Sequence, residues 1–130
     1  MKKINIKYKL NFGAGRDIKP ASEGWDNCDK QKGEGIITFN ADEFPYPFKD
    51  NTYDFILLKQ VLDFVEDIRE TLFELWRISK PNGIIRIEVP YYNNRGAFND
   101  IESKHFFSDN TFKIFVEETC IVNKQKKFQI

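Results

Sequence analysis

The chain has 130 residues, of which 41% are hydrophobic and 15% aromatic, and this composition predicts one folded domain with a real core and excludes a disordered chain. Lysine plus arginine and aspartate plus glutamate number 20 each, so no net charge draws the chain toward nucleic acid or an anionic membrane. The single histidine, His105, excludes a multi-histidine metal site within one chain, and the spacing of Cys28 and Cys120 predicts reduced thiols in a cytoplasmic protein.

Short strands and helices alternate along the chain, which predicts an α/β domain with a mainly parallel sheet. Residues 4–12 alternate apolar and polar side chains with a period of two, as a strand with one polar face does. Further strands are expected over residues 24–29 and 35–40. Since fully buried parallel strands are apolar on both faces, the polar face of the first strand is a departure that needs an explanation.

The middle of the chain contains its most apolar strand. Pro45 and Pro47 force an extended loop, and residues 53–59 then read as a central strand that is apolar on both faces. One or two helical turns are expected over residues 60–65. We expect Asp63, in these turns, to be a solvated residue.

The clearest helix follows directly. Asp67 is the expected N-cap and Glu70 stands at the capping-box spacing. The expected apolar stripe comprises Ile68, Leu72, Leu75 and Trp76. Residues 81–83, Pro-Asn-Gly, predict the end of the helix.

A fifth strand is expected over residues 83–90, with Ile85, Ile87 and Val89 on one face and Ile84, Arg86 and Glu88 on the other. A short helix is predicted around residues 110–115. Residues 119–122 and 127–130 predict a terminal hairpin.

Gly13 and Gly15 follow the first strand, and the absence of side chains there lets a polar group of a ligand approach the backbone N–H groups closely. Asp29, at the end of the second strand, is placed to accept two hydrogen bonds from a ribose diol. Asp42, after the third strand, is placed to reach an adenine amino group. These points at the ends of adjacent strands would frame an adenosine; the alternative is a plain turn flanked by surface acids.

At these residues the sequence resembles the class I S-adenosylmethionine-dependent methyltransferases, in particular small type 11-like members. The resemblance covers about residues 10–115 and rests on five segments in order: LNFGAG, WDNCD, ADEFPYPFKDNTYDFILLKQVLDFVED, LWRISKPNGIIRIEVP and FNDIESKHFFSDNTF. It implies a single Rossmann-like domain over residues 1–130 with strand order 3-2-1-4-5-7-6. It also implies S-adenosylmethionine as the cofactor.

The resemblance further implies the site. Gly13 and Gly15 would lie against the methionine part of the cofactor, Asp29 would hold the ribose, and residues 59–61 would line the other side. The expected cofactor-binding residues are Phe12, Gly13, Ala14, Gly15, Asp29, Lys30, Asp42, Lys59 and Gln60. The candidate catalytic residues are Tyr91 and His105, with Tyr92 and Asp100 as further candidates for a base or an acceptor pocket. For His105 a packing role is the alternative.

The segment after the glycine pair departs from the family pattern. Pro20 comes five residues after Gly15, so at most one helical turn fits before Trp25. The missing helix removes a helix dipole from the site and predicts one thinly covered sheet face, with Lys7 and Lys9 facing water or a partner.

Two further details narrow the expected function. The interval from Gly15 to Asp29 is shorter than in a dinucleotide fold, and Ile18 takes the place of a third glycine, which counts against a nicotinamide enzyme. Gln60 and Phe64 replace the histidines of the family's H-V-L-E-H segment.

The sequence therefore predicts a cytoplasmic S-adenosylmethionine-dependent methyltransferase that acts on a small molecule or metabolite. The alternative is a methyltransferase-like binding or assembly module with weak or no catalysis. We expect a small-molecule acceptor and a homodimer across the thinly covered face, and no nucleic acid, membrane or metal as partner.

Overall fold

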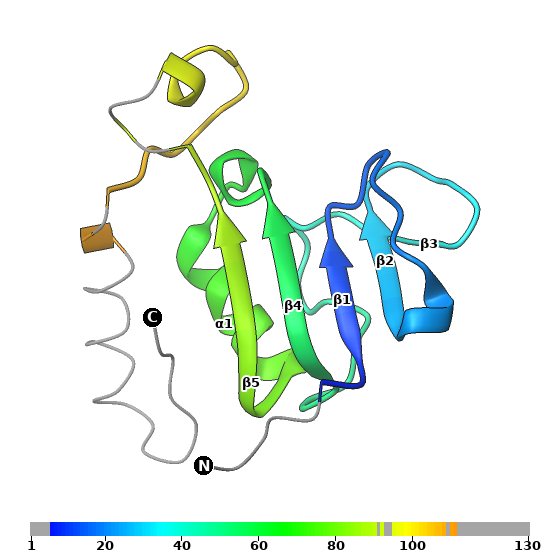
Figure 1. Ribbon diagram of the computed structural model, residues 1–130. Coiled ribbons are helices and arrows are strands. Elements are labelled where there is room, and N and C mark those ends of the chain that lie inside the picture. The colour runs from blue at the N-terminus through cyan, green and yellow to red at the C-terminus, as the bar shows by residue number, and fades with distance from the viewer. Residues whose placement is uncertain (1–5, 91, 93–94, 109, 112–130) are drawn as a thin grey trace.

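One parallel sheet organises the chain. The computed structural model describes residues 6–90, 92, 95–108 and 110–111. The strands are β1 (Lys9–Phe12), β2 (Trp25–Asp29), β3 (Ile36–Thr38), β4 (Tyr53–Lys59) and β5 (Ser79–Glu88). They pair in the order β3-β2-β1-β4-β5 (Figure 1), which confirms the α/β fold and the predicted order of these strands. The predicted terminal hairpin and most of the helix expected near residue 110 lie outside the described residues.

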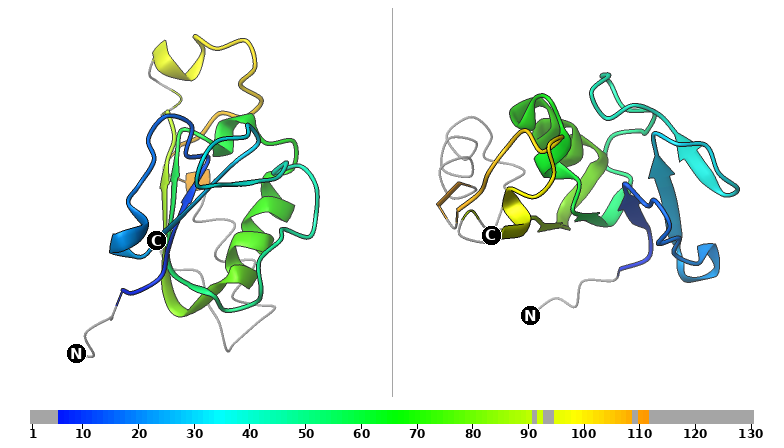
Figure 2. Two further views of the ribbon diagram at one scale, coloured as in Figure 1. Left: turned by 90° about the vertical axis from the view of Figure 1, so that its right-hand side faces the viewer. Right: turned by 90° about the horizontal axis from the view of Figure 1, so that it is seen from above.

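The helical elements lie on different sides of the sheet. They are η1 (Ala21–Glu23), η2 (Leu62–Phe64), α1 (Ile68–Ile78) and η3 (Arg95–Ala97). Both views in Figure 2 place α1 against one face of the sheet and the single turn η1 on the opposite side. Among the described residues, no helix is long and apolar enough to cross a membrane.

Helix α1 starts as predicted, because the side chain of Asp67 accepts a hydrogen bond from the Glu70 N–H at 3.1 Å. Its buried stripe consists of Thr71, Leu72, Leu75 and Ile78. The prediction of Trp76 in this stripe is wrong, because Trp76 is only half-buried. The buried positions one helical turn before and after Leu75 are Thr71 and Ile78.

The end of α1 differs from the prediction. The helix ends at Ile78 because Ser79 is extended (ψ 146°) and its hydroxyl donates to the carbonyl of Trp76. Strand β5 therefore begins at Ser79, not at Gly83. Its register jumps from the pair Tyr53–Ser79 to the pair Phe55–Ile84. The prediction that residues 81–83 end the helix is therefore wrong: they lie within β5 at this change of register, where Pro81 has no N–H for the ladder.

Strand β1 is shorter than predicted, starting at Lys9 rather than Ile4. The backbone N–H groups of Lys7 and Tyr8 donate to the Asp54 carboxylate at 3.0 and 2.9 Å. Residues 6–8 are therefore not part of the strand, although the Tyr8 carbonyl still accepts from the Asp54 and Phe55 N–H groups at 2.8 and 3.3 Å.

Aromatic rings fill the space beneath the crossover from β3 to β4, which contains no helix. Their centroids lie 5.1–5.8 Å apart in a connected cluster. The rings belong to Phe12, Phe39, Tyr46, Phe48 and Tyr53. The long loop is thus part of the core rather than a surface excursion.

Arg77 ties this crossover to α1. Its guanidinium donates to the Glu74 carboxylate at 2.6 Å, to the Phe48 carbonyl at 2.9 Å and to the Tyr46 carbonyl at 3.2 Å. A further contact reaches Asp50 at 2.8 Å, but Asp50 is 70% exposed, so solvent screens that pair. The planar fork thereby fixes a segment that secondary structure does not hold.

Side-chain amides replace the missing helix on the other face. Asn11 Nδ2 donates to Asn27 Oδ1 at 3.0 Å and to the Asp17 carbonyl at 2.7 Å. Asn27 also bonds both the N–H and the carbonyl of Lys19 at 2.9 Å. The loop after β1 is therefore hydrogen-bonded to the buried side-chain amides of β1 and β2.

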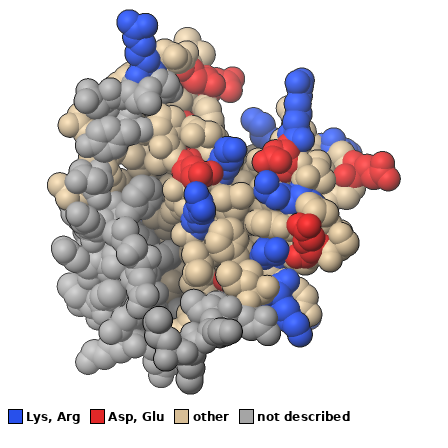
Figure 3. All heavy atoms as spheres, in the orientation of Figure 1, with Lys and Arg blue, Asp and Glu red and all other residues tan. Residues whose placement is uncertain are grey.

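The thin cover predicted for this face is confirmed, since η1 is its only described helical turn. Lys7 is exposed as expected, whereas Lys9 is half-buried with its ammonium 4.9 Å from the centroid of the Trp25 ring. Basic and acidic side chains alternate over the described part of this face (Figure 3). The described part of this face therefore carries no large patch of one charge.

We expect Arg77→Lys to lower the free energy of unfolding by about 1.5–3 kcal/mol, because the variant keeps the charge but loses the fork that binds the crossover carbonyls. Arg86→Lys is the matched control, since Arg86 is exposed on the sheet and should change stability by less than about 0.5 kcal/mol. Urea unfolding measures both, and equal losses would contradict the anchoring role of Arg77.

Candidate functional site

A cavity of about 680 Å³ opens at the carboxyl ends of the strands. Its walls come from residues that follow β1, β2, β3 and β4, and from the loop at residues 100–104. In Figure 1 this loop stands above the strand ends. The volume suits a ligand of cofactor size, and the position is where open α/β sheets bind ligands.

Gly13 sets how closely β1 and β4 approach at this end. Its φ is +75°, and a Cβ atom added there would lie 2.3 Å from Val61 Cγ2. Any side chain at this position would therefore collide with the residue that begins the turn after β4.

The amides of the glycine loop are already used within the protein. The N–H groups of Gly13 and Ala14 both donate to the Cys28 carbonyl at 2.9 Å. The Gly15 N–H donates to Asp29 Oδ2 at 2.8 Å. The loop thus offers a ligand close approach at Gly13 rather than a row of open donors.

Asp29 is held in place by the backbone on both sides. Its Oδ2 accepts from Gly15 and its Oδ1 accepts from the Gln31 N–H at 3.0 Å. Each carboxylate oxygen has further acceptor capacity, and the half-buried side chain lines the cavity. It remains able to accept hydrogen bonds from a diol.

Asp42 joins two walls of the cavity. Its Oδ1 accepts from the Glu66 N–H at 2.9 Å, and its own N–H donates to Asn40 Oδ1. The carboxylate therefore positions the segment after η2 as well as facing the cavity.

The structure brings most of the predicted cofactor-binding residues together. Those that line the cavity are Phe12, Gly13, Asp29, Lys30, Asp42 and Gln60. Ala14, Gly15 and Lys59 do not line it: Ala14 is buried, Gly15 supports Asp29, and Lys59 is an exposed residue that ends β4.

The candidate bases are separated. Asp100 lines the cavity. His105 does not, and its Nε2 lies 2.7 Å from the Val65 carbonyl, as a packing histidine would. Tyr92 is half-exposed, with its N–H on the Phe107 carbonyl, and Tyr91 lies outside the described residues.

Several lining residues were not predicted from sequence. Phe39, Asn40 and Ala41 follow β3, and Phe64 and Val65 belong to or follow η2. For Phe39, Asn40 and Ala41, the position directly after β3 was an available signal. Ile101, Glu102 and Lys104 carried none, because they reach the cavity only through the path of a long loop.

Two buried titratable groups lie at this end. Burial raises the pKa of the Cys28 thiol to about 12, so this lining residue stays protonated at neutral pH. Asp63 is 4% exposed, which corrects the expectation of a solvated residue: the turn η2 faces inward beneath the loop at residues 100–104. In the described part of the chain, no three His, Cys, Asp or Glu side chains gather as metal ligands would.

A family described as "Methyltransferase domain" matches residues 14–87, which is more than half of the chain. The chain belongs to this family. The strand order and the site at the strand ends agree with a class I, Rossmann-like methyltransferase domain. The cofactor of the domain is S-adenosylmethionine. None of the curated proteins matches the chain.

Solved structures share the fold. A SAM-dependent methyltransferase from Archaeoglobus fulgidus has a TM-score of 0.72 and 18% identity, over 88% of this chain and 61% of that one. A SAM-dependent methyltransferase from Thermotoga maritima has a TM-score of 0.68 and 19% identity, over 85% of this chain and 62% of that one. The YcgJ protein of Bacillus subtilis has a TM-score of 0.66 and 16% identity, over 87% of this chain and 61% of that one. The chain thus spans about three fifths of the length of these relatives.

The residues of the methyltransferase domain fit its cofactor. S-adenosylmethionine needs close approach to the backbone, a carboxylate for its ribose and an apolar wall for its adenine. Gly13 would allow the first and Asp29 would supply the second, and Phe39, Ala41 and Val61 line the same cavity with apolar surface. In the described part of the chain, the Asp29 carboxylate accepts from the backbone N–H groups of Gly15 and Gln31 rather than from a cationic side chain.

We expect Gly13→Ala to lower the free energy of unfolding by about 2 kcal/mol or more, because it combines a positive φ with a steric overlap on Val61. Gly15→Ala is the matched control: its φ is +52° but no atom lies within 4 Å of the added Cβ, so only about 1 kcal/mol is expected. Thermal unfolding measures both. Adding Val61→Ala to Gly13→Ala should recover part of the loss, and no recovery would contradict the overlap.

Proposed function

We propose that this chain transfers a methyl group from S-adenosylmethionine to a small-molecule acceptor. The observation that carries the proposal is a single cavity that is lined both by Gly13 and Asp29 and by the loop at residues 100–104. Donor and acceptor would share this cavity, which supplies the proximity that a transfer between two bound molecules requires.

For the donor, we propose that Asp29 accepts hydrogen bonds from the ribose hydroxyls and that Gly13 admits the methionine part. Asp42 would lie near the adenine, between the apolar side chains of Phe39 and Ala41 and the segment after η2. The backbone bonds that hold Asp29 before any ligand enters support this role, because a fixed acceptor loses little entropy on binding.

When bound, the cofactor supplies a methyl group already activated by its sulfonium. The chain then has to position the acceptor and exclude water. Phe64, Val65 and Ile101 offer apolar surface for this in the cavity, and Asp100 adds a carboxylate to its lining. An acceptor that must lose a proton would find Asp100 as the described candidate base that lines the cavity.

The second candidate function is a methyltransferase-like module that binds or assembles without catalysis. The short connection between β1 and β2 favours it, because η1 lies away from the cavity and brings no helix dipole to the cofactor. The two functions differ in whether the chain binds the cofactor tightly.

Titration calorimetry with S-adenosylhomocysteine separates them. We expect micromolar binding by the chain and at least a tenfold loss in Asp29→Ala, because two charge-assisted hydrogen bonds disappear. Asp17→Asn is the control, since Asp17 is exposed in the same loop and does not line the cavity. Absence of binding at millimolar ligand, or preferential binding of NAD, would sink the enzyme proposal.

We also propose a cytoplasmic location and a homodimer. The buried, unbridged thiol of Cys28 suits a reducing compartment. Ile84, 38% exposed, lies on the thinly covered face beside Phe55, and Arg86 and Glu88 carry opposite charges that a two-fold related copy can complement. Sedimentation velocity should detect the dimer, and a monomer at all concentrations would contradict it.

A further inference from the structure

Two segments far apart in sequence run side by side above the strand ends. The Asp63 carbonyl accepts from the N–H groups of Lys104 at 2.7 Å and His105 at 3.2 Å. The His105 ring contacts the Val65 carbonyl, and the Lys104 ammonium pairs with Glu66. The loop at residues 100–105 is therefore fastened to residues 63–66 along its last three positions.

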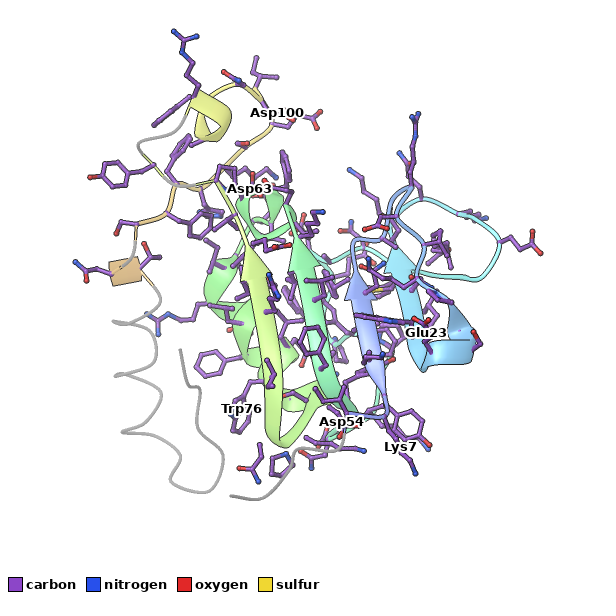
Figure 4. All side chains as sticks on the ribbon, viewed as in Figure 1. Lys7, Glu23, Asp54, Asp63, Trp76 and Asp100 are labelled. Carbon is purple, nitrogen blue, oxygen red and sulfur yellow. The ribbon has the colours of Figure 1, made fainter. Side chains whose placement is uncertain are left out.

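Asp63 lies beneath this fastening. Its side chain is 4% exposed, and its Oδ1 atom has no hydrogen-bond partner in the described structure. Its Oδ2 atom has a long contact of 3.5 Å with the Ser103 hydroxyl. Figure 4 places Asp63 and Asp100 at the same end of the molecule, above the arrowheads of β4 and β5.

An ionised carboxylate in this place is poorly compensated. Burial raises the pKa of Asp63, and the negative charge of Asp100 adds to the effect, while Ser103 and His105 oppose it. The nearby ammonium of Lys104 is paired with Glu66, which carries a negative charge of its own. Ionisation is thus easier when the loop moves away and water reaches Oδ1.

We propose that Asp63 is a positioning residue for the methyltransferase site: its neutral carboxyl group keeps residues 100–105 closed over the cavity, and its ionised form releases them. The loop carries Asp100, Ile101, Glu102 and Lys104, which line the same cavity as Gly13 and Asp29. The charge state of Asp63, which does not line the cavity, thereby sets the shape of the part of the cavity that residues 100–104 line. The link to ligand binding rests on the proposed function; the link to loop closure does not.

The sign of the pH dependence follows from linkage. Because the closed form holds its proton above the ordinary carboxyl pKa of 3.8, it loses stability relative to the open form as pH rises from that value through the raised pKa. The loop is therefore most firmly closed below that value and loosens as the pH rises toward neutral.

Amide hydrogen exchange of the ligand-free chain tests the closure directly. We expect the protection factors of the Lys104 and His105 amides, which correct for the intrinsic effect of pH, to fall about fivefold between pH 3 and pH 7.5, as for the loss of one hydrogen bond. In Asp63→Asn, which cannot ionise, this fall should be absent. His105→Gln is a second control, because it replaces the imidazole that contacts the Val65 carbonyl and leaves Asp63 in place.

Asp100→Asn sharpens the test. Removing this charge lowers the cost of ionising Asp63, so the fall in protection should move to lower pH in Asp63-containing protein and stay absent in the double variant. Glu43→Gln is the control for a general change in charge, because Glu43 is exposed and does not line the cavity.

Binding of S-adenosylhomocysteine gives the second readout. Wild-type affinity should weaken toward neutral pH in parallel with protection, and Asp63→Asn should bind equally across the range. Protection that stays constant with pH in the wild type, or falls equally in Asp63→Asn, overturns the role of Asp63. Normal pH-dependent protection without any ligand binding would instead count against the proposed function and leave the closure intact.

Discussion

The contact between Gly13 and Val61 is the constraint on which the site depends. β1 and β4 are neighbours in the sheet, yet the chain leaves β1 toward β2 and leaves β4 toward β5, so the strand order reverses between them. The ends of two diverging connections meet there, and only a residue without a side chain lets them touch. The cavity opens at this reversal because the connections separate above it.

Side-chain contacts on both faces of the sheet support the contact between Gly13 and Val61. The crossover from β3 to β4 has no helix, and an aromatic cluster and the Arg77 guanidinium pack and bind this segment instead. On the opposite face, the Asn11–Asn27 pair fixes the loop that continues from Gly13. Both sets of contacts position residues around the cavity, so the described part of the domain keeps the strand order with little helical cover.

Features that depend on neighbouring residues in the sequence were predictable, whereas features that depend on contacts between distant segments were not. The limits of β4, the cap at Asp67 and the cavity position of Asp29 follow from periodicity, capping chemistry and a motif at a strand end. The early end of α1 depends on Ser79 joining β5, and the burial of Asp63 depends on a loop some forty residues later. Pairing partners of this kind leave no trace in a local pattern.

The amide stitching between Asn11, Asn27 and the Lys19 backbone gives the two faces of the sheet different responses to temperature. Burial of apolar side chains under α1 weakens on cooling, whereas hydrogen bonds between amides carry little of that heat-capacity effect. Cold should therefore loosen the α1 face before the loop after β1. The glycine end of the cavity would then keep its shape at temperatures where its opposite wall begins to relax.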